Sequence, residues 1–159
     1  MNLNNVRDLR KVSNLVLAYW SDTQKNRESR RLSGFSMGGG LAFWFAANNP
    51  DIFGGVTAYG ATFHHILAGK GKQIVGEPLE LAEKYYTEEA AEIIEGGVFW
   101  LVKKNAEKIR GKLAINIRIG SGDVLICENK VMSLYLTELG IPHGFKVFEG
   151  AGHELGKII

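Results

Sequence analysis

The chain has 159 residues, of which 45% are hydrophobic and 23% are charged, a balance typical of one folded globular domain over residues 1–159. There are 19 Lys and Arg against 17 Asp and Glu, and the net charge of +2 indicates no nucleic-acid partner. The single cysteine, Cys127, excludes an internal disulfide and a cysteine-based metal site.

The first residues lack the apolar core of a signal peptide, and the longest apolar stretch, residues 38–47, is too short to span a bilayer. We therefore expect no membrane partner, and a cytoplasmic location if Met1 is the true start of the protein.

In chain order, the pattern alternates between helix and strand, which predicts an α/β fold with about four parallel strands and flanking helices. An amphipathic helix is expected over 6–19, and residues 61–97 form a less regular insert with helical pieces at 81–86 and 88–95. The other expected helices are 37–48, 98–109 and 128–139, and the expected strands are 31–35, 53–59, 114–119 and 145–148.

Two local predictions concern the C-terminal third of the chain. In the helix at 128–139 the apolar residues Val131, Leu134, Tyr135 and Leu139 are expected to face the core. His143 is expected in the loop before the last strand.

Residues 34–38 read Gly-Phe-Ser-Met-Gly and match the G-x-S-x-G pattern of a nucleophile elbow. In such an elbow a serine occupies a sharp turn between a strand and a helix, and small neighbours let the two segments approach. A strand-like run precedes Ser36 and a helical run follows it, as the motif requires. The alternative interpretation is a glycine-rich helix start without chemistry.

A serine nucleophile needs a base and an acid that orients the base. Asp123 follows the strand at 114–119 and His153 follows the strand at 145–148, so both should lie at the sheet edge that carries Ser36. Glu149 is the other acidic residue near His153, and we prefer Asp123 because it lies in a loop directly after a strand.

These segments resemble the C-terminal half of the esterase family of α/β-hydrolases that includes feruloyl and acetyl-xylan esterases, the esterase D type and mycolyltransferases. The resemblance rests on residues 27–39, on Gly-Ser-Gly-Asp at 120–123 and on residues 139–153. It implies Ser36 as nucleophile, Asp123 as acid, His153 as base and the backbone N–H of Met37 as one donor of the oxyanion hole.

The expected activity is hydrolysis of a carboxylic ester through an acyl-enzyme, with no cofactor or metal and with a small-molecule or carbohydrate-linked ester as substrate. His64 and Trp100 are candidate substrate-binding residues, with loop exposure and helix packing as their alternatives. An acyltransferase of the same family, or a catalytically impaired fragment or remnant of a larger esterase, are the other interpretations.

Relative to that family, the chain lacks the first strands and the loop that supplies the second oxyanion donor. The strand at 31–35 should therefore be an open edge of the sheet, and one apolar face of the sheet should be under-covered. We expect a homo-oligomer or part of a longer chain.

Overall fold

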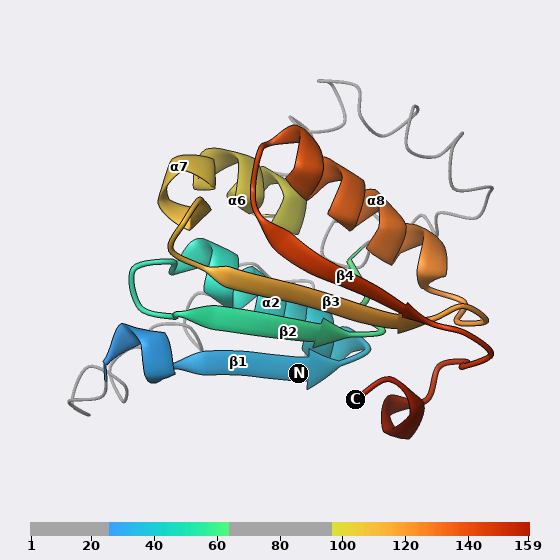
Figure 1. Cartoon of the computed structure of the whole chain (residues 1–159). Helices are drawn as coiled ribbons and strands as arrows, with labels where there is room; N and C mark the ends of the chain where they lie inside the picture. The colour runs from blue at the N-terminus through green and yellow to red at the C-terminus, as the bar shows by residue number, and fades with distance from the viewer. Residues whose placement is uncertain (1–25, 64–96) are drawn as a thin grey trace.

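The structure is a computed structural model that describes residues 26–63 and 97–159, and the helices expected at 6–19, 81–86 and 88–95 lie outside these ranges. A layer of helices covers one face of a four-stranded sheet, in which the strands run side by side in the order β1-β2-β3-β4 (Figure 1). All three strand pairs are parallel. The elements are η1 (Arg27–Ser29), β1 (Arg31–Phe35), α2 (Met37–Asn48), β2 (Gly55–Tyr59), α6 (Val98–Lys104), α7 (Ala106–Ile109), β3 (Ala114–Gly120), α8 (Ile126–Glu138), β4 (His143–Phe148) and η2 (Leu155–Lys157).

The α/β class, the four parallel strands and the flanking helices agree with the sequence prediction. The helix expected at 98–109 is divided into α6 and α7 at Asn105. The Asn105 side-chain amide donates to the carbonyl of Ala47 at 2.8 Å, near the end of α2, so its side chain is used in packing. His143 is not in a loop: it is the first residue of β4, and its ring lies within hydrogen-bonding distance of the Ser133 hydroxyl on α8.

The buried face of α8 differs from the apolar face expected from the sequence. Tyr135 and Leu139 do pack at the margin of the core, but Leu134 is 53% exposed. A polar residue, Asn129, is fully buried instead, because its amide donates to the Ala61 carbonyl at 2.8 Å and its carbonyl accepts from the Ala61 N–H at 3.3 Å. Burial also raises the pKa of Tyr135 to about 12, with the Glu138 carboxylate adding to the effect.

The two faces of the sheet have opposite character. Alternate strand residues such as Val56, Ile115 and Ile117 are buried in one core with side chains of α2, α6 and α8. The other face carries a row in register across the four strands, Phe35, Tyr59, Arg118 and Lys146, whose members are half-buried or exposed. The preceding row is Ser33, Thr57, Asn116 and Gly144.

This face is therefore not uniformly apolar, whereas the sequence predicts an apolar one. The described helices pack against the opposite face, and on this one polar and basic side chains lie among aromatic rings. Arg118 lies 6.0 Å from the ring centroids of both Tyr59 and Phe148, and the Lys146 ammonium lies 4.4 Å from that of Phe148. Long cationic side chains thus lie beside the aromatic rings on this face.

Candidate active site

Ser36 lies between β1 and α2 in a backbone conformation that side chains rarely adopt, with φ of 56° and ψ of −125°. Within 26–63 and 97–159 it is the only residue other than glycine with a positive φ. Its N–H donates to the Tyr59 carbonyl at 2.9 Å, and its carbonyl accepts from the Thr62 N–H at 3.1 Å. These hydrogen bonds to the last residue of β2 and to the chain after it hold the strained turn in place.

Two glycines make this turn sterically possible. A Cβ on Gly34 would lie 2.2 Å from the Gly38 carbonyl oxygen, and a Cβ on Gly39 would lie 2.8 Å from the Gly34 oxygen. A Cβ on Gly38 would meet no atom within 4 Å. The close approach of strand and helix therefore requires Gly34 and Gly39, and the second glycine of the G-x-S-x-G pattern is not the one that packing demands.

The loops after β3 and β4 are joined to each other by backbone contacts. The Gly122 N–H donates to the Ala151 carbonyl at 2.9 Å, and the Gly150 N–H donates to the Ser121 hydroxyl at 2.9 Å. A Cβ on Gly120 would lie 2.1 Å from the Ala151 oxygen, so the approach of the loops depends on a bare backbone there. Asp123 and His153 are consequently carried on one joined unit.

The side chains of Ser36, His153 and Asp123 form a continuous line of hydrogen bonds. Nε2 of His153 lies 3.0 Å from Oγ of Ser36, and its Nδ1 lies 2.8 Å from Oδ2 of Asp123. The Asp123 side chain is fully buried, and its other oxygen accepts from the Leu125 N–H at 2.9 Å. With Nδ1–H donating to the carboxylate, Nε2 carries the lone pair that faces the serine hydroxyl. The arrangement can move a proton from Ser36 to His153.

Phe35 is a further contributor that the sequence analysis did not place at the site. Its ring stacks on the imidazole of His153 with the ring centroids 4.5 Å apart and the ring planes inclined by 30°. The sequence places Phe35 only in the expected strand at 31–35 and in the motif at 34–38. As the residue before Ser36 it is the last one of β1, but nothing in the motif indicates that the loop after β4 lies against it.

Met37 is the first residue of α2, and the helix begins its backbone hydrogen bonds with the N–H groups of Gly39 and Gly40, which donate to the Ser36 carbonyl. The N–H of Met37 therefore precedes the bonded turn, at the positive end of the helix. That position suits a donor to a developing negative charge beside Ser36.

Two of the other candidates lie within the described residues, and neither takes part in this line of hydrogen bonds. Trp100 lies on α6, half-buried against the core, with the Lys104 ammonium 4.3 Å from its ring centroid. Glu149 is exposed, and Nδ1 of His153 faces Asp123 instead. His64 lies outside the described residues.

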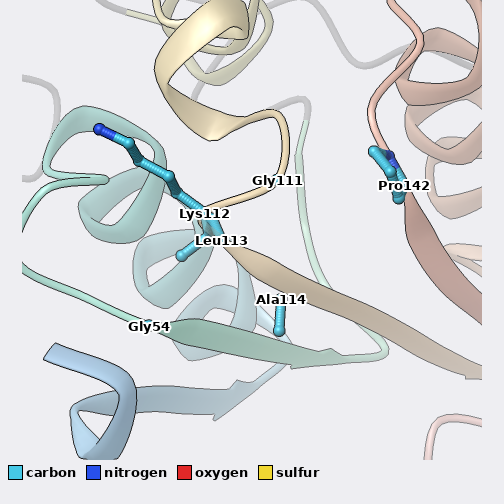
Figure 2. A pocket seen from close by; sticks show the side chains of 6 residues that line it. All are labelled: Gly54, Gly111, Lys112, Leu113, Ala114 and Pro142. Atoms are coloured by element: carbon cyan, nitrogen blue, oxygen red, sulfur yellow. The ribbon is translucent and has the colours of Figure 1, made fainter.

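A hollow of about 260 Å³ lies between the segments that lead into β2, β3 and β4 (Figure 2). Its lining residues come at or just before the amino ends of strands: Gly54, Gly111, Lys112, Leu113, Ala114 and Pro142. Ser36, Asp123 and His153 all follow carboxyl ends of strands, so the hollow is not part of the site.

Within the described residues, no group of three or more His, Cys, Asp or Glu side chains is arranged to hold a metal ion. A search of the same ranges finds no helix long and apolar enough to cross a membrane.

With this geometry established, comparison with known proteins shows the family. Residues 13–155 match the model of the family described as "Putative esterase". The chain belongs to this esterase family. No curated protein is similar enough in sequence to match the chain.

Solved structures share the fold at low identity. The fluorophosphonate-binding serine hydrolase F of Staphylococcus aureus is 18% identical over 95% of this chain and 57% of its own, with a TM-score of 0.64. The S-formylglutathione hydrolase of the same organism is 20% identical over 92% of this chain and 52% of its own, with a TM-score of 0.59. A ferulic acid esterase is 22% identical over 83% of this chain and 46% of its own, with a TM-score of 0.59. This esterase-family chain thus has the α/β-hydrolase fold and spans about half the length of these structures.

Proposed function

We propose that the protein hydrolyses carboxylic esters in two steps, with Ser36 as the nucleophile of an acyl-enzyme. The observation that carries the proposal is the line of hydrogen bonds from Ser36 through His153 to the buried Asp123, at 3.0 and 2.8 Å. The strained backbone of Ser36 supports it, because a cost of about 1–3 kcal/mol at one residue is typical of functional sites.

In the first step Oγ of Ser36 attacks the ester carbonyl carbon while its proton passes to Nε2 of His153. The carbonyl oxygen becomes an oxyanion, for which the N–H of Met37 is the proposed donor. The carbon–oxygen bond to the alcohol then breaks, and the alcohol leaves with the proton from His153.

In the second step His153 takes a proton from water, and the resulting hydroxide attacks the acyl carbon. The bond to Oγ breaks, the acid leaves, and Ser36 regains its proton from His153. Asp123 holds the imidazole in the required tautomer and stabilises its cationic form in both steps. The substrate class is an ester of a small molecule or a carbohydrate, and Trp100 and His64 remain proposed contributors to its binding.

The test is a panel of p-nitrophenyl esters from acetate to longer acyl chains, run with Ser36→Ala. The variant should lose hydrolysis and keep its fold, because removing the hydroxyl of a half-buried turn residue leaves no cavity in the core. Ser33→Ala is the matched control, since Ser33 is an exposed serine on β1, the strand that ends just before Ser36.

A fluorophosphonate probe adds an independent measurement. Intact-mass and peptide analysis should show one adduct, on Ser36, and none in Ser36→Ala. Hydrolysis that survives in Ser36→Ala, or an adduct on another residue, would contradict the assignment.

A further inference from the structure

The ring of Phe35 is placed to act on the histidine and not only to fill space. It lies 4.5 Å from the imidazole, centroid to centroid, with the planes 30° apart, so one face of the imidazole rests against an aromatic π-face. The imidazole edge makes its two hydrogen bonds in other directions, to Ser36 and Asp123. Phe35 therefore contacts the part of the ring that these partners leave free.

An aromatic face responds to the charge of the group that lies on it. It attracts a cation within about 6 Å of its centroid, whereas a neutral ring gains only packing and dispersion. In the proposed reaction His153 is neutral before the attack and cationic once it has taken the Ser36 proton. A contact that is stronger in the second state lowers the barrier between them.

We infer that Phe35 is a positioning residue for His153, whose stacked ring fixes the imidazole plane and stabilises the imidazolium that forms during catalysis. This inference rests on the proposed function for its role in the reaction, but its effect on His153 protonation can be measured without any substrate.

The charged groups near His153 do not change when Phe35 is substituted. Asp123 faces the ring from the loop after β3, and Glu154, the next residue in the chain, has its carboxylate 3.0 Å from the Lys157 ammonium. Arg118 lies on the same sheet face as Phe35 but two strands away. A shift in His153 protonation can therefore be assigned to the aromatic ring.

The first measurement follows the His153 ring by NMR across pH in the wild-type chain, Phe35→Leu, Phe35→Tyr and Phe45→Leu. Leucine keeps an apolar side chain but has no π-face, so the midpoint of the titration should fall by about half a pH unit. Tyrosine keeps the ring and should restore the wild-type midpoint. Phe45 contacts Trp44 on α2, away from the site, so Phe45→Leu controls for loss of a packed phenylalanine.

The second measurement is the pH profile of ester hydrolysis. In Phe35→Leu, kcat/KM should fall about 2- to 5-fold, with the lower limb of the profile moved to lower pH. Phe35→Tyr should return both quantities to those of the wild-type chain.

The outcomes separate the two proposals. An unchanged NMR midpoint in a folded Phe35→Leu, or a midpoint that Phe35→Tyr fails to restore, would overturn the inference about Phe35 whatever the activity. A shifted midpoint in a chain that hydrolyses no ester would leave the inference about the ring standing and count against the proposed function.

Discussion

At the scale of single residues, the site combines one unfavourable backbone conformation with one fully buried charge. Ser36 is strained so that its hydroxyl reaches Nε2 of His153. The Asp123 carboxylate is removed from water and is compensated by two donors, the Leu125 N–H and the His153 ring. Buried charges that lack such partners are costly, so both contacts stabilise the buried carboxylate.

Asp123→Asn is expected to keep the structure and reduce turnover by about 10⁴, the size of the effect in a serine-protease triad. The amide can donate to Nδ1 of His153, which would place the imidazole proton on Nε2. Nε2 would then have no lone pair to accept the hydroxyl proton of Ser36. Steady-state hydrolysis of a p-nitrophenyl ester measures the change.

Glu149→Gln is the matched control, because Glu149 is exposed and lies four residues before His153. It should leave turnover within about twofold of the wild-type value. If Glu149→Gln is instead the damaging change, Asp123 is not the acid.

The three polar side chains could be predicted from the sequence because each follows a strand in a loop with an identifiable glycine pattern. Asn129 and Phe35 could not. Asn129 is a polar residue in a helix, and its burial depends on a partner, Ala61, that is 68 positions away in the chain. Phe35 looks like any apolar strand residue until the loop after β4 is placed over it.

At the scale of elements, the turn from β1 to α2 controls how Ser36 is presented. Gly34→Ala should lower the free energy of unfolding by about 1–3 kcal/mol, since the added methyl would overlap the Gly38 carbonyl and force the helix away from the strand. Gly38→Ala should leave it unchanged or raise it by up to about 1 kcal/mol, because there is open space and alanine favours a helix. Chemical denaturation of the two variants measures the contrast, and equal losses would show that the turn has no such asymmetry.

The strands and α2 follow from short apolar runs between turn residues, which is why their predicted bounds differ from the observed ones by two residues or fewer. The predictions were poorer where tertiary contacts decide. Asn105 ends α6 through a contact with Ala47, and α8 turns a polar residue inward to reach the chain after β2. Hydrophobic periodicity carries no signal for either contact.

At the scale of the whole molecule, the sheet has an edge at β1, which pairs only with β2 among the described residues. The Arg30 carbonyl and the Ser36 N–H form hydrogen bonds with Gly54 and Tyr59 on the β2 side. Backbone groups of successive strand residues point to alternate sides, so Ser33 presents its N–H and carbonyl to the open edge. Unpaired edges recruit other chains.

We expect the chain to self-associate at micromolar concentration through this edge. Ser33→Pro should shift it toward monomer, because proline removes a donor at the edge without removing a bond to β2. Ser33→Thr keeps the N–H and should associate as the wild-type chain does. Sedimentation velocity decides the matter, and a wild-type chain that stays monomeric would rule the prediction out.

Besides the bonds that link Ser36, His153 and Asp123, the loops of the site are joined by hydrogen bonds that use none of these three side chains. Backbone groups and the Ser121 hydroxyl join the loops after β3 and β4, and backbone groups alone fasten the Ser36 turn to Tyr59 at the end of β2 and to Thr62 beyond it. The framework and the chemistry can consequently change independently during evolution. A descendant that exchanged Ser36 for cysteine, or lost the histidine altogether, would inherit the same prearranged loops and could acquire a different reaction, or a purely binding role, without first having to rebuild its fold.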